Sequence, residues 1–276
     1  MRARRAGRDA IAHAFDVDTR VEALADGAFR ATITDRWNAI GDRPNGGYLL
    51  GVCLQALRGT LPFTDPLAVS AFFLRPTAPG VAEVRTEVAR IGRRVATGEA
   101  RLLQDGMETV RVVASFTNLD TASGRTLVLA QPPDLPAPED TVDLLGGRSI
   151  AGISIVDRYE YRMAALPGWV GGQPGGDPTV QFWLRFKDGR EPDTLALPAL
   201  VDAAFPVVME LGERGSSTIE LTVHVRARPV PGWLACRVRT RYVIAGYHEE
   251  DFEVWDSSGA LVAQSRQLAL LPAASG

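Results

Sequence analysis

The sequence predicts an α+β fold made of two copies of one unit, each a helix followed by an antiparallel sheet. Two stretches of the chain follow the same plan: apolar residues recur at helical spacing, and alternating runs with turn signals come after them. Of the 276 residues, 46% are hydrophobic and 23% are charged. That balance is typical of a globular protein, and the length allows one large domain or two ordinary ones.

The repeat is anchored by two arginines that are each followed by proline. Arg75 and Arg228 lie at the ends of equivalent strands, and 228 − 75 gives an offset of 153 residues. The same offset superposes two apolar segments, 45–59 and 197–212, and each is predicted to form a helix. We therefore expect each unit to begin with a long helix.

Period-two runs follow each expected helix and contain hairpin signals. QDGM at 104–107 and DSSG at 256–259 interrupt these runs where tight turns would join two strands. A proline-rich stretch without periodicity separates the two units. The predicted organisation is therefore an N-terminal domain (1–120), a linker (121–150) and a C-terminal domain (151–276).

Composition argues against several classes of partner and cofactor. The net charge of −3 gives no reason to expect nucleic acid or an anionic membrane. The basic N-terminal segment has no apolar core of the kind a secretory signal needs, so we expect a cytoplasmic protein. Cys53 and Cys236 stand in apolar contexts and are predicted to be core residues. No spaced Cys/His set or phosphate-binding glycine motif is present, so neither a metal nor another cofactor is expected.

Several motifs resemble a known family. FDVDTRV (15–21), DRWNAIGDRPNGGY (35–48) and IGRR (91–94) are similar to an acyl-CoA thioesterase-like family of double-hotdog proteins. The second half resembles the C-terminal hotdog of acyl-CoA thioesterase II. The resemblance implies a tandem hotdog fold, in which each long helix is wrapped by a curved antiparallel sheet. It also implies an acyl-CoA substrate, with coenzyme A as part of that substrate, and a homo-oligomer such as a dimer of double hotdogs.

The resemblance also assigns a catalytic set. In the family, a carboxylate on the second helix, a threonine opening the next strand and a glutamine on the last strand orient a hydrolytic water. The matching residues are Asp202 in LVDAAF, Thr218 in STIELT and Gln267 in QSRQLAL.

The residues themselves are consistent with a site. Asp202 has apolar neighbours on both sides, and a carboxylate buried there must find donors or take up a proton. Gln267 lies on an otherwise small or apolar strand face, where a buried amide needs partners. The alternative for Asp202 is a helix cap, and for Gln267 an amide satisfied by the backbone.

The repeat provides an internal comparison. Subtracting 153 places Leu49 at the position of Asp202, and Asp65 at the position of Thr218. The first unit therefore lacks the helix carboxylate, which predicts one catalytic set per chain.

Two further groups of residues are candidates for binding the substrate. Gly46 and Gly47 are predicted to open the first helix, where backbone N–H groups favour an anionic oxygen, and Tyr48 follows them. They are the candidate oxyanion site, although the glycines could simply form the tight turn before the helix. Arginines suited to the phosphates of coenzyme A are Arg75, Arg93, Arg94 and Arg228.

We hypothesise that Asp202 activates a water that attacks the thioester carbonyl. In an alternative mechanism, Asp202 itself attacks and forms an anhydride. No G-x-S-x-G elbow is present to supply a serine nucleophile. Two other functions stay open: a non-catalytic acyl-CoA or lipid binder, and a hotdog hydratase or dehydratase, although neither predicted helix holds the histidine that the latter would need.

Overall fold

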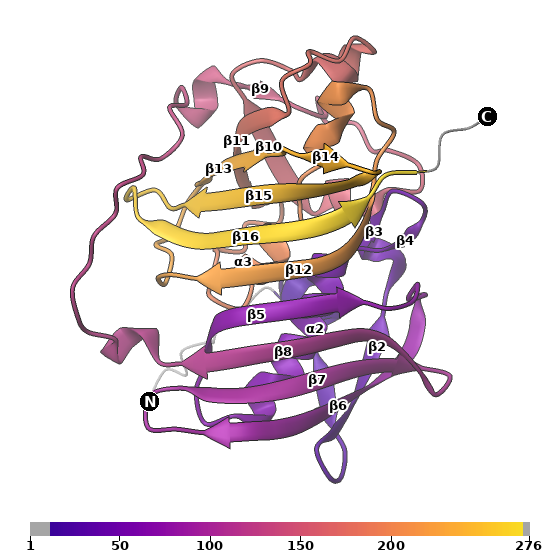
Figure 1. Cartoon of the computed structure of the whole chain (residues 1–276), viewed down its shortest axis with the longest axis vertical. Coiled ribbons are helices and arrows are strands. Elements are labelled where there is room, and N and C mark those ends of the chain that lie inside the picture. The colour runs from indigo at the N-terminus through magenta and orange to yellow at the C-terminus, as the bar shows by residue number, and fades with distance from the viewer. Residues whose placement is uncertain (1–11, 273–276) are drawn as a thin grey trace, which may run out of the picture.

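The computed structural model describes residues 12–272 and is dominated by one antiparallel sheet with few helices (Figure 1). Its strands in chain order are β1 (Val21–Ala23), β2 (Ala28–Ile33), β5 (Asp65–Phe73), β6 (Gly80–Ile91), β7 (Ala96–Gln104), β8 (Met107–Thr117), β9 (Val142–Asp143), β10 (Tyr159–Met163), β11 (Thr179–Phe186), β12 (Ser217–Val225), β13 (Leu234–Arg239), β14 (Val243–Ile244), β15 (Tyr247–Trp255) and β16 (Leu261–Leu270). Two shorter strands, β3 (Asn38–Ala39) and β4 (Arg43–Pro44), pair separately.

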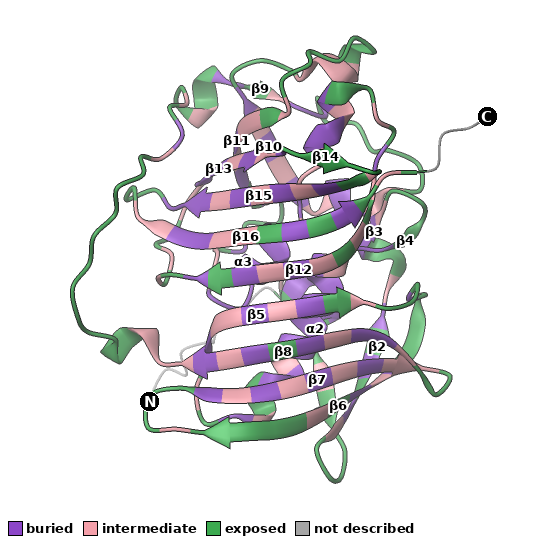
Figure 2. Cartoon of the chain, viewed as in Figure 1, coloured by how far each residue is buried: buried purple, intermediate pink, exposed green. Residues whose placement is uncertain are grey.

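The sheet has two halves that meet at one strand pair. Across the sheet, the order is β1–β2–β6–β7–β8–β5–β12–β16–β15–β13–β11–β10–β9, with β14 paired to β15. Strands β5 and β12 pair antiparallel, with Ala71 opposite Leu221, and so join the first half to the second (Figure 1). Buried and more exposed residues alternate along many strands (Figure 2), as expected where one face of a sheet covers a core.

The predicted helix of the first half is present as α2 (Gly46–Thr60). Asn45 caps it, because its side-chain oxygen accepts a hydrogen bond from the Tyr48 N–H at 3.0 Å. Most residues of α2 are buried, including Leu50, Val52 and Leu54. The helix therefore belongs to the core, and it lies behind strands β5 and β8 in Figure 1.

The prediction of one long helix over 197–212 is wrong. The structure has a short α3 (Leu197–Leu200), a turn, and the 3-10 helix η6 (Val207–Leu211). Pro206 accounts for the break: it has no N–H to donate to the Asp202 carbonyl four residues earlier, and it disfavours helical backbone in Phe205.

Side chains satisfy the backbone groups that this break leaves free. The Asp202 carbonyl accepts from Asn45 Nδ2 at 3.0 Å, and the Ala203 carbonyl accepts from the Tyr161 hydroxyl at 2.7 Å. The Val207 N–H, which would have bonded Ala203 in a helix, donates instead to Glu250 Oε2 at 2.9 Å. The break thus places backbone groups where side chains from other elements can reach them.

The segment between the halves has little regular structure. It contains the 3-10 turns η2 (Leu119–Thr121), η3 (Pro138–Asp140) and η4 (Ser154–Asp157), while η5 (Gly168–Gly171) lies further on in the second half. Strand β9 falls inside the segment expected as a linker (121–150) and pairs with β10 at the sheet edge.

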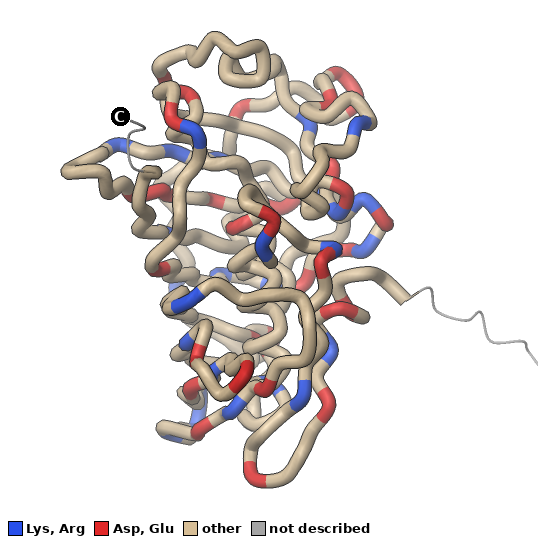
Figure 3. The backbone as a smooth tube through the Cα atoms, turned by 90° about the vertical axis from the view of Figure 1, so that its right-hand side faces the viewer, with Lys and Arg blue, Asp and Glu red and all other residues tan. Residues whose placement is uncertain are grey.

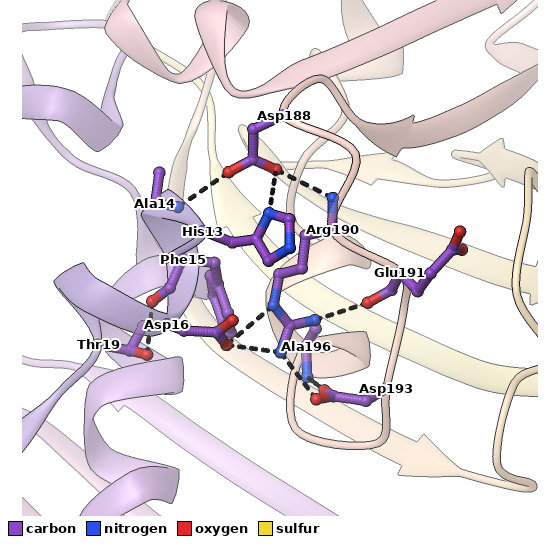
Figure 4. Close-up of polar contacts among 10 residues, drawn as sticks. All are labelled: His13, Ala14, Phe15, Asp16, Thr19, Asp188, Arg190, Glu191, Asp193 and Ala196. Carbon is purple, nitrogen blue, oxygen red and sulfur yellow. Dashed lines mark hydrogen bonds and ion pairs between the residues drawn. The ribbon is translucent and has the colours of Figure 1, made fainter. Parts of the chain in front are cut away.

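A polar network ties the start of the described chain to the second half (Figure 4). Arg190, which is 8% exposed, donates to Asp16 of α1 (Ala14–Asp18) at 2.8 and 2.9 Å and to Asp193 at 2.7 Å. Asp188 accepts from the Ala14 N–H at 2.8 Å. These contacts hold α1 against the loop that precedes α3.

Other expectations from composition can be compared with the structure. Cys53 and Cys236 are free and buried, as predicted. Acidic and basic residues are interspersed along the backbone (Figure 3). Within residues 12–272, no helix has both the length and the apolar character required to span a bilayer, and no cluster of side chains suited to holding a metal ion occurs.

Candidate functional site

A cavity of about 430 Å³ lies where the two halves meet and is lined by both. Its apolar walls include Leu49 and Phe73 from the first half and Ile155 and Phe205 from the second. The polar residues at the cavity that concern its chemistry are Asn45, Asp202, Thr218, Glu250 and Gln267. The structure therefore brings the three predicted catalytic residues to one cavity, although they come from separate elements of the second half.

Asp202 follows α3 and points its carboxylate at the start of α2. Its Oδ2 atom accepts a hydrogen bond from the Gly47 N–H at 2.6 Å and another from Asn45 Nδ2 at 2.9 Å. The carboxylate therefore caps the helix of the other half, where the helix dipole favours negative charge. The predicted cap of its own helix is not found, because Asp202 lies beyond the end of α3 and caps α2 instead.

Burial dominates the titration of Asp202. Desolvation raises its pKa from 3.8 to about 6, against the opposing effect of the hydrogen bonds from Gly47 and Asn45. A carboxylate in this range is ionised at neutral pH and is a stronger base than an ordinary aspartate. Its environment is therefore suited to taking a proton from a bound water.

Thr218 and Gln267 form a second polar group at the cavity. The Thr218 hydroxyl donates to Gln267 Oε1 at 2.9 Å, and Gln267 Nε2 donates to Glu250 Oε1 at 3.0 Å. Thr218 lies beside a β-bulge of β12, and Gln267 is opposite Glu250 in the pairing of β16 with β15. Contacts with Asn45 and Gly47, rather than with Thr218 or Gln267, hold Asp202.

Glu250 is a cavity residue that our interpretation of the sequence missed. It is 6% exposed, and desolvation raises its pKa from 4.5 to about 7, with the charge of Asp202 also raising it. A signal was available, because His248, Glu250, Phe252 and Val254 alternate along one strand, and the apolar members mark the core face.

The glycines at the start of α2 allow a close approach. A Cβ at Gly47 would lie 2.7 Å from the Ala199 carbonyl oxygen, and a Cβ at Gly46 would lie 2.7 Å from the Phe73 ring. The Gly47 N–H is taken by Asp202, whereas Gly46 lines the cavity. Tyr48 is fully buried and does not line the cavity; its hydroxyl donates to the Asp18 carbonyl at 3.0 Å.

The predicted phosphate-binding arginines do not share one place. Arg75 is exposed and lines the cavity, and so does Arg43, which the sequence interpretation did not single out. Arg93 and Arg94 are exposed and are not among the cavity residues. Arg228 is engaged elsewhere, because its Nη2 atom is 2.8 Å from Asp65 Oδ2.

The prediction that Asp65 occupies the position of Thr218 is wrong by one residue. The β-bulges between Pro66 and Ala68 in β5 and between Thr218 and Glu220 in β12 match Pro66 with Thr218. Asp65, one residue earlier, lies in a filled network. Its carboxylate is 1% exposed and accepts from the Thr194 hydroxyl, the Arg228 guanidinium and the Leu119 N–H, at 2.8, 2.8 and 2.9 Å. This network occupies the start of β5, whereas the start of β12 lines the cavity.

Comparison with known families gives two matches that together span most of the chain. Residues 33–117 match the model of an acyl-CoA thioesterase N-terminal domain, and residues 129–271 match that of an acyl-CoA thioesterase C-terminal domain. An uncharacterized protein of Mycobacterium tuberculosis is 30% identical over 270 residues, covering 89% of this chain and 91% of that protein. The thioesterase-like protein TwmA of Talaromyces wortmannii is 24% identical, covering 93% of this chain and 91% of its own length.

Solved structures show the same architecture. A protein of Thermobifida fusca with a provisional thioesterase II name has a TM-score of 0.85 at 28% identity, covering 95% of this chain and 99% of its own. A hotdog-fold protein of Alicyclobacillus acidocaldarius has a TM-score of 0.84 at 23% identity, with the same coverage. The acyl-CoA thioesterase II TesB2 of Mycobacterium marinum has a TM-score of 0.75 at 19% identity, covering 95% and 100%.

Proposed function

Because the chain belongs to the acyl-CoA thioesterase family, we propose that it hydrolyses acyl-CoA thioesters at the cavity around Asp202. One observation carries the proposal: a desolvated carboxylate and a Thr–Gln pair line the same cavity at the start of a helix. The general activity, thioester hydrolysis, is that of the family, while the acyl-CoA substrate and the roles of the residues are our proposal.

In the proposed mechanism, ionised Asp202 takes a proton from a water in the cavity as that water attacks the thioester carbonyl. Oδ2 is held by Asn45 and Gly47, which leaves Oδ1 as the atom to accept the proton. Thr218 and Gln267 hold the water from the other wall. The carbon–sulfur bond breaks, the thiolate of coenzyme A leaves, and no covalent intermediate on the chain is required.

The oxyanion would be met by the Gly46 N–H at the start of α2. Gly46 lines the cavity, and its N–H is at the first position of the helix, where partial positive charge accumulates. The Gly47 N–H serves Asp202 instead, so the predicted pair of glycines has two different tasks. Tyr48 supports this helix start from the core.

The coenzyme A portion would lie at the exposed rim beside Arg43 and Arg75, where guanidinium groups can pair with phosphates. The apolar walls would hold the acyl group. We further propose that the two halves form a tandem hotdog, that two such chains dimerise, and that the enzyme works in the cytoplasm without a cofactor, a nucleic acid or a membrane.

The test is thiol release from a panel of acyl-CoA thioesters of increasing chain length. We expect turnover with at least one member, and the preferred length would report the depth of the acyl site. Binding of acyl-CoA without turnover across the whole panel would overturn hydrolysis and leave a binding protein.

A further inference from the structure

A continuous series of hydrogen bonds runs along the cavity wall from η6 to β12. The Val207 N–H donates to Glu250 Oε2 at 2.9 Å, and Gln267 Nε2 donates to Glu250 Oε1 at 3.0 Å. Gln267 Oε1 then accepts from the Thr218 hydroxyl at 2.9 Å. Glu250 is the one carboxylate in this series of hydrogen bonds. Both of its oxygens accept from neutral donors, the Val207 N–H and the Gln267 amide.

The direction of each hydrogen bond follows from the charge of Glu250. An ionised carboxylate only accepts, so the amide of Gln267 must turn its nitrogen toward Glu250 and its oxygen toward Thr218. The Thr218 proton is then committed to Gln267. What remains for the cavity is an acceptor lone pair on Thr218 and the second N–H of Gln267, which together can hold one water in one orientation.

We propose that Glu250 is a positioning residue that fixes the orientation of the Gln267 amide and thereby the polarity of the water site. It acts through Gln267 and does not touch the reacting atoms. The inference rests on the proposed hydrolysis for its effect on turnover, but the orientation of the amide can be measured without any substrate.

The surroundings of Glu250 allow this orientation to respond to pH. Burial, with smaller contributions from the charges of Asp202 and of Glu249, its neighbour on β15, raises the pKa of Glu250 to about 7 against the opposing effect of the hydrogen bonds from Val207 and Gln267. The groups bonded to it from η6 and β16 are neutral, and Arg43, Arg75 and Tyr161 line the cavity without a hydrogen bond to it. Protonated Glu250 would carry a donor, and the Gln267 amide would then turn over to accept from it.

Glu250→Gln keeps the size of the side chain and resembles the protonated glutamate. One end of its amide must face the Val207 N–H and the other must face Gln267, so a carbonyl placed on Val207 forces the Gln267 amide to turn. We expect kcat/KM at pH 8 to fall by about 10- to 100-fold, the scale of a small misplacement at a reacting centre. The ionisation near pH 7 should vanish from the pH profile, leaving the one near 6 from Asp202.

Two further variants separate positioning from general damage. In a Gln267→Ala background, Glu250→Gln should have no additional effect on kcat/KM, because the residue through which it acts is gone. Glu210→Gln is the matched control: Glu210 is 5% exposed and accepts from the Gly175 N–H, but it does not line the cavity. It should leave the pH profile unchanged.

The decisive measurement is the side-chain amide signal of Gln267 in a ¹H–¹⁵N spectrum, assigned by its loss in Gln267→Ala. We expect it to shift with a midpoint near pH 7 in the wild type and to be static in Glu250→Gln. A static wild-type signal, or additive effects of the two substitutions, would overturn the positioning role. A moving signal in a protein that hydrolyses no thioester would support the positioning role and reject the proposed function instead.

Discussion

The helix α2 of the first half and the equivalent α3 of the second half differ in length and in what they contribute to the cavity. In the first half α2 is uninterrupted; at its start Gly46 lines the cavity and the Gly47 N–H donates to Asp202. In the second half the equivalent helix stops after four residues, and Asp202 lies just beyond its end. One unit therefore provides the donors of a helix start, while the other provides the carboxylate that needs them.

A second contrast concerns the strands that follow the helices. Thr218 opens onto the cavity and bonds Gln267, whereas Asp65, at the start of β5, is sealed by Arg228, Thr194 and the Leu119 N–H. Both strands begin with polar residues, but the start of β12 lines the cavity and the start of β5 does not.

The largest effect is expected from Asp202→Asn, which keeps the shape but removes the base. We predict a loss of at least about 100-fold in kcat/KM, the range for general-base catalysis, measured by thiol release. In the wild type, kcat/KM should rise as pH increases through about 6, because Asp202 acts in its ionised form. Turnover that survives the substitution would remove Asp202 from the centre of the mechanism.

Folding provides the control for Asp202→Asn. The folded-state pKa of about 6 lies above the ordinary 3.8, so the stability that Asp202 contributes is full below pH 3.8 and is lost as pH rises through 6. Above pH 6 the asparagine variant should therefore melt no lower than the wild type. A lower melting temperature would attribute the lost activity to damage of the fold.

A smaller loss is expected from Gln267→Ala. Removing the amide leaves Thr218 and Glu250 without their shared partner, and the water loses one of its contacts. We predict a fall in kcat of about 10- to 100-fold. Gln264→Ala, three residues away on the same strand and outside the cavity, is the matched control and should retain full activity.

Phe205→Ala should change selectivity more than rate. Phe205, Tyr161 and Ala204 line both the main cavity and a small apolar space behind it, whose other walls include Trp169 and Phe182. Removing the ring should join the two spaces and shift the preferred acyl chain to a longer one. The exposed Phe72 gives the control Phe72→Ala, and an unchanged chain-length profile in Phe205→Ala would place the acyl group elsewhere.

The smallest effect on activity is expected from Asp65→Ala. This change removes the acceptor of three hydrogen bonds in the network at the start of β5, so the free energy of unfolding should fall by about 1–3 kcal/mol. The value of kcat/KM should match that of the wild type, as determined beside a denaturant titration. Loss of turnover in a folded Asp65→Ala variant would mean that the start of β5 also contributes to activity.

Sequence patterns predicted the elements well where one residue type decides the outcome. The helix at 45–59 and the hairpin turns follow from periodicity and turn residues. The family resemblance selected Asp202, Thr218 and Gln267, and the structure places all three at one cavity. Pro206 indicates the break within 197–212, but the match to the helix at 45–59 led to the prediction of one continuous helix. The Asn45–Asp202 contact could not be read, because it joins residues 157 positions apart through packing.

The hydrogen bonds of the Asn45 side-chain amide have a consequence for how the protein becomes active during its synthesis. Its nitrogen meets both the carbonyl and the carboxylate of Asp202, while its oxygen caps α2. A nascent chain that has emerged only as far as the first half carries these donors without Asp202, so the proposed hydrolysis would begin only after the second half has been synthesised and has packed against the first.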